Sequence, residues 1–208
     1  MKEINIVNVE LKRILNDWLE VLIKADRSRY PYDAGVGKDG PITPEYACST
    51  EYLTHMQGKK VDGFPEKTLG VDLMKYRPQP LADALFKLDT DLLNWSGSRN
   101  NAVKMLYPKG GYMGWHHNAN AAGYNILLSW SEKGTGFFRY QDPITKEIIT
   151  MQDKPGWTCK VGYYGAWHES NKIYWHCASA AQEERITLGY IIPHEGMWES
   201  MCEDIQSV

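Results

Sequence analysis

The second half of this 208-residue chain is a series of short runs of β-branched and aromatic residues, separated by turn-forming residues. The series starts after Arg99, and no long helical pattern interrupts it. Runs of this kind are typical of strands. The expected strands are residues 102–107, 112–116, 124–130, 136–140, 147–151, 157–162, 173–177 and 185–192. Many short strands in succession predict a mainly β fold, an antiparallel sandwich or jelly roll.

The first half of the chain carries helical patterns instead. Apolar residues recur within residues 8–24 at the spacing of one helix face, and Asn8 is placed to cap this helix. A Thr-Pro pair opens a second expected helix, 43–58. A third covers residues 80–97, with Gly97 as its stop. These helices are expected to pack against the sheet.

The remaining segments give no regular pattern. Residues 26–40 are rich in Arg, Tyr, Pro and Gly, and residues 59–79 show no periodicity, so both are expected to be irregular. The length of the chain fits one domain with a sizeable core. We therefore expect a single domain made of a helical and irregular part (1–99), a β core (100–192) and a C-terminal tail (193–208).

Charge and cysteine content argue against several classes of protein. A net charge of −3 provides no positive field that would attract nucleic acid or an anionic membrane. No run approaches the roughly 20 apolar residues of a membrane span, and the N-terminus lacks the apolar core of a signal peptide. We therefore expect a cytoplasmic protein. The four cysteines form no Cys-x-x-Cys pair, which predicts buried, reduced thiols. The oligomeric state is not predicted.

Two histidines, an asparagine and an arginine stand out among the expected strands. His116 ends one strand, Asn118 follows it, and His176 lies near the end of a later strand. Strands this far apart in sequence can be neighbours in a jelly roll, so the three side chains are expected to converge at one mouth of the barrel. Imidazoles with an oxygen donor and open positions suit iron(II). Arg185, on the following strand, is expected to point into the same barrel.

This arrangement resembles the iron(II)- and 2-oxoglutarate-dependent dioxygenases, in particular the prolyl-4-hydroxylase branch. The matching segments are Tyr107-Pro108-Lys109-Gly110-Gly111, Trp115-His116-His117-Asn118, His176 and Arg185-Ile186-Thr187-Leu188. The resemblance covers residues 100–192 and implies a double-stranded β-helix, a jelly roll or cupin-like fold, packed against the N-terminal helices. It says nothing specific about those helices.

The resemblance also implies roles for single residues. His116 and His176 would hold Fe(II), and Arg185 would pair with the distal carboxylate of the co-substrate 2-oxoglutarate. A planar guanidinium suits a carboxylate because two hydrogen bonds fix its orientation. Tyr107 would donate its hydroxyl to the same co-substrate. Reaction with O2 would then hydroxylate a substrate, which is the usual outcome in this family.

Asn118 stands where the family has an aspartate. Asparagine has nearly the shape of aspartate but carries no charge. Three arrangements are open: Asn118 binds the metal through its amide oxygen, it lies beside the metal while water completes the coordination, or the site has lost iron and kept the fold. Halogenating members of the family also lack the carboxylate, but they have a small residue there. Asparagine would fill the space that chloride needs.

Other histidines compete for the same roles. His117 is an alternative to His116, but neighbouring strand residues face opposite sides, and only His116 has the two-residue offset to Asn118. His168 is an alternative to His176, but no arginine follows it at a comparable distance. His55 and His194 are interpreted as solvated or core histidines.

The substrate is less well determined. Trp115, Tyr124, Trp167 and Trp175 are candidates to line a mouth that stacks on a ring, a sugar or a peptide. Residues 163–171 and 30–38 are candidate lids or, equally, surface connections. The leading hypothesis is a hydroxylase acting on an amino-acid or peptidyl side chain, with a small molecule or a peptide as its partner. The alternatives are a catalytically impaired jelly-roll binding module and an oxygenase that modifies nucleotides or nucleobases.

Overall fold

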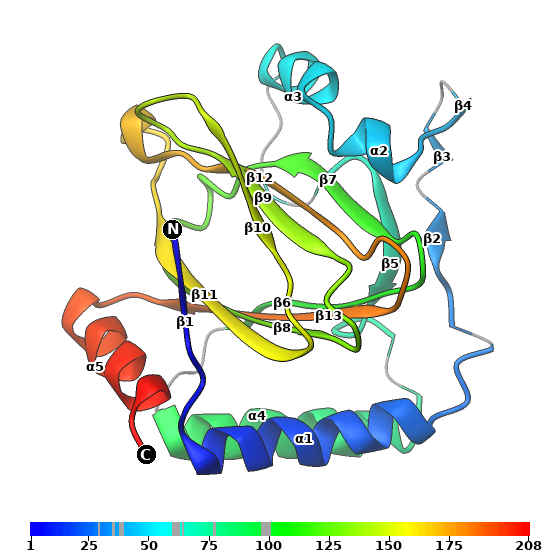
Figure 1. The fold of residues 1–208 in the computed structure, drawn as a ribbon, viewed down its shortest axis with the longest axis vertical. Coiled ribbons are helices and arrows are strands. Elements are labelled where there is room, and N and C mark those ends of the chain that lie inside the picture. The colour runs from blue at the N-terminus through cyan, green and yellow to red at the C-terminus, as the bar shows by residue number, and fades with distance from the viewer. Residues whose placement is uncertain are drawn as a thin grey trace.

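The computed structural model describes residues 1–28, 30–34, 36–37, 40–59, 63, 65–76, 78–96 and 101–208. Antiparallel strands fold into a nearly closed barrel, with helices packed on its outside (Figure 1). The expected fold class, a mainly β jelly roll with flanking helices, is confirmed. All eight expected strands are present: β6 (Asn101–Tyr107), β7 (Tyr112–His116), β8 (Gly123–Ser131), β9 (Phe137–Gln141), β10 (Ile148–Gln152), β11 (Gly156–Tyr164), β12 (Trp175–Ser179) and β13 (Arg185–Ile192).

Two layers of strands face each other across the barrel. One layer has the order β1-β11-β8-β13-β6, where β1 is Lys2–Ile4, and the other has the order β7-β12-β9-β10. Strand β5 (Thr68–Asp72) joins the layers, because its first residues pair with β7 and its last residues pair with β6. Alternate residues of each strand therefore point into the space between the layers.

Two long helices cover the outer face of the β8 layer. Helix α1 (Val9–Lys24) is capped by Asn8, whose side chain accepts a hydrogen bond from the Leu11 amide at 2.9 Å. Helix α4 (Leu81–Ser96) runs beside it (Figure 1). Both expected helices are confirmed, and the expected stop at Gly97 lies outside the described residues. The apolar faces of the two helices pack against outward side chains of β8, β11 and β13 and form the largest core.

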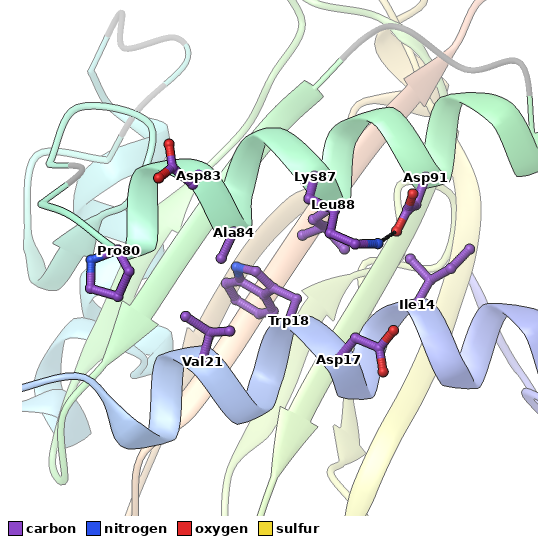
Figure 2. Close-up of a pocket in the computed structure, with 10 residues that line it drawn as sticks. All are labelled: Ile14, Asp17, Trp18, Val21, Pro80, Asp83, Ala84, Lys87, Leu88 and Asp91. Atoms are coloured by element: carbon purple, nitrogen blue, oxygen red, sulfur yellow. Dashed lines mark hydrogen bonds and ion pairs between the residues drawn. The ribbon is translucent and has the colours of Figure 1, made fainter.

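A groove runs between α1 and α4 on the surface of the protein. Figure 2 shows the Trp18 indole rising from α1 beneath Ala84 of α4. The groove has a volume of about 290 Å³ and is lined by residues of these helices and Pro80. None of the candidate site residues lies there. The helical layer therefore supports the barrel from outside and leaves the candidate site to the strands.

The opposite layer is covered by two short helices. The expected helix 43–58 is present in two pieces, α2 (Pro44–Ala47) and α3 (Thr50–Gln57), because Ser49 starts a new helix by accepting a hydrogen bond from the Tyr52 amide. Their buried residues pack with outward residues of β7 and β12 in a second core. That core contains Ala47, Cys48, Tyr52, Leu53, Met56, Tyr112, Trp115 and Cys177.

Three parts of the structure differ from the sequence-based expectation. Strand β5 lies in the expected loop 59–79, and its pairing with two distant strands leaves no local periodic signal. Helix α5 (Glu195–Gln206) occupies the expected tail and buries only Met201, Cys202 and Ile205, so its apolar stripe is short. The expected irregular segment 26–40 contains short strands. They are β2 (Asp33–Ala34), β3 (Val36–Gly37) and β4 (Gly40–Pro41). Elsewhere in the chain, a 3-10 turn, η1 (Ser170–Lys172), lies between β11 and β12.

Two further expectations concern membranes and cysteines. Among the residues that the structure describes, no helix is both long and apolar enough to cross a bilayer. All four cysteines are buried and unpaired by disulfides, as expected.

Candidate functional site

A cavity of about 380 Å³ lies between the two strand layers. Alternate residues of β8 and β13 line one wall, and residues of β7 and β12 line the other. Tyr107, His116, Asn118, His176 and Arg185 all border this cavity. The structure thus brings together the five residues to which the sequence assigned metal binding and co-substrate binding.

The two histidines face each other across paired strands. His116 and His176 are direct partners in the register of β7 and β12, and their ring centres are 4.1 Å apart. Met113 of β7 pairs with Ala178 of β12, and His116 pairs with His176. One residue lies between the two paired positions in β12 and two lie between them in β7, so β7 contains a bulge there. A bulge re-aims the side chains that follow it. This extra residue turns His116 toward the cavity that Met113 also lines.

Backbone carbonyl groups fix the orientation of both imidazoles. Nδ1 of His116 lies 2.8 Å from the Gly114 carbonyl oxygen, and Nδ1 of His176 lies 2.9 Å from the Tyr174 carbonyl oxygen. A carbonyl oxygen only accepts hydrogen bonds, so Nδ1 carries the proton in each neutral ring and Nε2 keeps its lone pair. An N–H donated to a backbone carbonyl is the usual support of a metal-binding histidine. Both rings are therefore prepared to bind a metal through Nε2.

Asn118 reaches the same corner of the cavity. Its Nδ2 atom lies 3.5 Å from Nε2 of His176. Which end of an amide is nitrogen is an assignment from hydrogen bonding, and a half-turn of the amide places Oδ1 at the same point. No group of three His, Cys, Asp or Glu side chains that could hold a metal occurs among the described residues. The third polar side chain at this corner is therefore an amide rather than a carboxylate.

Burial keeps both histidines neutral. It lowers the pKa of His116 well below the ordinary value, and the neighbouring His176 adds to this effect. Burial lowers the pKa of His176 to about 4. A neutral imidazole is the form that binds metal. At neutral pH a metal ion would therefore displace no proton from either ring.

These lowered pKa values predict acid sensitivity of the metal-free protein. Below pH 6.5 the histidines of the unfolded chain take up protons, whereas folded His176 does so only near pH 4. The unfolded state then binds more protons, so stability falls as the pH drops through this window, by about 1.4 kcal/mol per pH unit for each histidine. Urea unfolding at pH 7, 6 and 5 with a chelator present measures the slope. The double variant His116→Gln/His176→Gln should lose it, and an unchanged slope would contradict the assignment.

Arg185 lies at the other end of the cavity, at the start of β13. It is paired in register with Tyr107 of β6 and Ser131 of β8. Its guanidinium donates from Nε to Oδ2 of Asp153 at 2.6 Å and from Nη2 to Oδ1 of Asp153 at 3.4 Å. Further bonds go to hydroxyl groups, from Nη2 to Ser129 at 3.1 Å and from Nη1 to Thr187. The expected inward orientation of Arg185 is what the structure shows.

The ring of Tyr107 lies beneath this guanidinium, 5.6 Å from Cζ of Arg185 to the ring centre. Its hydroxyl group is 3.8 Å from the sulfur of Met113. Burial raises the pKa of Tyr107 to about 12, so the hydroxyl keeps its proton. Tyr107 is thus a buried hydrogen-bond donor at the arginine end of the cavity.

Four residues around Arg185 were not identified from the sequence. Ser129, Thr187, Asp153 and Lys160 come from three strands and from the loop after β10. One signal was present: a lysine at position 160, between Cys159 and Val161, inside an expected strand. Buried lysines are rare unless they are paired. Asp153 has no comparable local signal, because it follows the end of a strand and resembles an ordinary turn residue.

The aromatic residues expected at the mouth lie elsewhere. Trp115 is fully buried in the core beneath α2 and α3, and Trp175 packs on the same outer face of its layer. Both are neighbours of inward histidines, so strand alternation turns them outward. Tyr124 faces outward from β8, with its ring 4.8 Å from Tyr163 and 5.2 Å from Trp198. Trp167 is 54% exposed on a loop. None of the four lines the cavity.

The remaining histidines also lie away from the cavity. His117 is buried on the outer face, edge-on to Trp167 and Trp175 at 4.7 and 4.5 Å between ring centres. His168 is exposed on the loop after β11, and His55 stacks on Tyr52 in α3. His194 precedes α5 and makes no capping side-chain bond. The preference for His116 over His117 and for His176 over His168 agrees with these positions.

The two candidate lids remain predictions. Within 163–171, Glu169 accepts hydrogen bonds from the Tyr163 hydroxyl at 2.7 Å and the Ala166 amide at 3.1 Å, so this loop is braced in the structure. The segment 30–38 is only partly within the described residues.

No protein-family model matches the chain, and no curated protein does. Among solved structures, the chain is similar to a Pseudomonas putida prolyl-4-hydroxylase, with 16% sequence identity and a TM-score of 0.34 over 60% of this chain and 67% of that chain.

Proposed function

We propose that this protein is an Fe(II)- and 2-oxoglutarate-dependent oxygenase that hydroxylates an amino-acid or peptidyl side chain. The observation that carries the proposal is the pairing, within one buried cavity, of two Nε2-presenting histidines at one end and a buried arginine with hydroxyl donors at the other. A dicarboxylate that chelates a metal at one end and forms an ion pair at the other matches both ends.

The donor set fits a divalent first-row metal. Imidazole nitrogens suit iron, zinc, copper and nickel, and an oxygen donor with open positions favours non-haem iron. His116 and His176 would hold the ion, with the amide oxygen of Asn118 as the third donor. When bound together, iron(II), 2-oxoglutarate and O2 supply the oxidant that inserts oxygen into a C–H bond of the substrate.

The chain itself would bind and orient the reactants. Arg185 and the hydroxyl groups of Ser129 and Thr187 would fix the distal carboxylate, since a hydroxyl oxygen that accepts from the guanidinium still has its own hydrogen to donate. The protonated Tyr107 hydroxyl would add a fourth donor at this end. Apolar walls between the layers would exclude water, which strengthens these interactions.

Anaerobic titration with Fe(II) and then 2-oxoglutarate tests the proposal. A weak visible charge-transfer band should appear only when both are present, and succinate should form once O2 is admitted. Failure of the purified protein to bind Fe(II), together with no conversion of 2-oxoglutarate, would refute the proposed function.

Asn118 offers a prediction that depends on its place beside His176. Asn118→Asp adds an anionic oxygen with little change in volume, so we expect Fe(II) to bind on the order of tenfold more tightly. Competition with a metal chelator measures the affinity. Asn120→Asp is the matched control, because it is the same substitution at another asparagine that lines the cavity. Equal effects of the two substitutions would show that Asn118 does not take part in coordination.

The same residue favours one alternative function, a jelly-roll binding module that has lost catalysis. An amide donates less charge to a metal than a carboxylate does, and its Nδ2 atom occupies the lone pair of His176 in the structure. In this alternative the cavity would still bind a carboxylate through Arg185. Slow decarboxylation of 2-oxoglutarate that His176→Ala abolishes would exclude it.

A further inference from the structure

Three ionised side chains are buried together at the arginine end of the cavity. Asp153 bridges two cations: it accepts from Nε of Arg185 at 2.6 Å and from Nζ of Lys160 at 2.9 Å. The side chains of Arg185 and Asp153 are each 1% exposed, and that of Lys160 is fully buried. Burial lowers the pKa of Lys160, and the neighbouring Asp153 carboxylate opposes this effect. With all three side chains ionised, the cluster has a net charge of +1.

An unbalanced buried charge is costly unless something compensates it. Two other buried charges of the described chain show such compensation. Lys104 forms an ion pair with Asp89 on the far side of the β8 layer, and the Glu183 carboxylate accepts hydrogen bonds from Ser131, Thr135 and the Lys133 amide. The cluster at Arg185 instead opens onto a cavity. An anion in that cavity would supply its counter-charge.

Asp153 also determines which edge of Arg185 faces the cavity. Its two oxygens take Nε and Nη2 on one edge of the guanidinium. The remaining bonds of Nη1 and Nη2 go to Thr187 and Ser129, both of which line the cavity. Arg185 can therefore present only its Nη1 side and these hydroxyl groups to a ligand, and it is held there before the ligand arrives.

We propose that Lys160, which does not line the cavity, is a positioning residue that gives this end of the cavity its net positive charge, while Asp153 holds Arg185 in the orientation that receives a carboxylate. The proposal rests on the proposed function for the identity of the ligand, 2-oxoglutarate. The net positive charge of the cluster requires only an anionic group as its partner. Glutarate has the same distal carboxylate as 2-oxoglutarate but lacks the keto group through which 2-oxoglutarate chelates a metal. It therefore serves as a probe of the metal-free protein.

The experiment compares the dissociation constants of glutarate and of 2-oxoglutarate by calorimetry with metal-free wild type and two variants. Lys160→Met removes one charge and keeps the side-chain length, so the cluster becomes neutral. We expect binding to weaken by roughly tenfold to a hundredfold, the effect of one unit charge at an effective dielectric constant of about 20. The double variant Lys160→Met/Asp153→Asn restores a net charge of +1, and its amide oxygen can still accept from Nε of Arg185 while Thr187 and Ser129 hold the other nitrogens. It should therefore bind more tightly than Lys160→Met. Lys104→Met, another buried lysine, is the matched control and should bind like wild type.

The outcomes distinguish a failure of this proposal from a failure of the proposed function. If wild type turns over 2-oxoglutarate but Lys160→Met binds both ligands as tightly as wild type, the role of Lys160 is refuted and the function stands. If Lys160 controls glutarate binding but Fe(II) does not bind, the function is refuted and the anion site stands. Failure of the double variant to bind better than Lys160→Met, with both variants folded by circular dichroism, overturns the charge argument. In active enzyme, Lys160→Met should raise the KM for 2-oxoglutarate more than it lowers kcat.

Discussion

Replacing His176 with alanine is expected to weaken Fe(II) binding by more than about a hundredfold and to abolish conversion of 2-oxoglutarate. The ring presents Nε2 to the cavity, opposite His116 and beside Asn118, so its loss leaves one imidazole and one amide. Loss of a supporting hydrogen bond to a ligand alone costs roughly tenfold to a hundredfold in metal affinity, and loss of a ligand should cost more. Anaerobic competition with a chelator gives the affinity, and succinate formation gives the activity.

The control for this variant is His168→Ala, which removes the same side chain from an exposed loop. It should bind Fe(II) like wild type. His176 borders the cavity but also packs on Phe138 and Tyr164, so circular dichroism and the urea midpoint are measured to show that the variant is folded. If His176→Ala keeps wild-type metal affinity, the metal site lies elsewhere.

The sequence was informative where local pattern determines the structure. Strand runs after residue 100 set the barrel, and the order of His116, His176 and Arg185 placed three side chains around one cavity. Strand alternation also explains the aromatic residues that were misplaced. Once His116 and His176 point inward, their neighbours Trp115 and Trp175 must point outward. The same alternation was the reason to prefer His116 over His117, so it should also have removed these two tryptophans from the expected mouth of the cavity.

The rest depends on contacts between distant segments. The bulge in β7 that aims His116 is visible only in the register with β12. Asp153 joins Arg185 and Lys160 across a loop and two strands, and no spacing in the sequence predicts that a loop aspartate will be buried between them. Strand β5 likewise forms because two distant strands offer it partners.

Asp153→Asn is expected to lower the free energy of unfolding by about 3–5 kcal/mol, the usual cost of removing one partner from a buried ion pair. Burial favours a raised pKa for Asp153, but Arg185 and Lys160 outweigh it and hold the pKa below its ordinary value. Without the carboxylate, two cations remain buried together. Asp17→Asn is the surface control: Asp17 and its partner Arg13 are 49% and 50% exposed, so we expect a loss of at most about 1 kcal/mol.

A double-mutant cycle with Lys160→Met then identifies the cause of the loss. In the Asp153→Asn background, Lys160→Met removes one of two unpaired buried cations and should raise the urea midpoint, whereas in wild type it removes a charge that Asp153 partly compensates and should change the midpoint much less. The difference between the two backgrounds follows from electrostatics and not from packing, because the methionine fills the same volume in both. If Lys160→Met changes stability equally in both, the three side chains do not form one coupled cluster, and the excess positive charge at the cavity would have no structural basis.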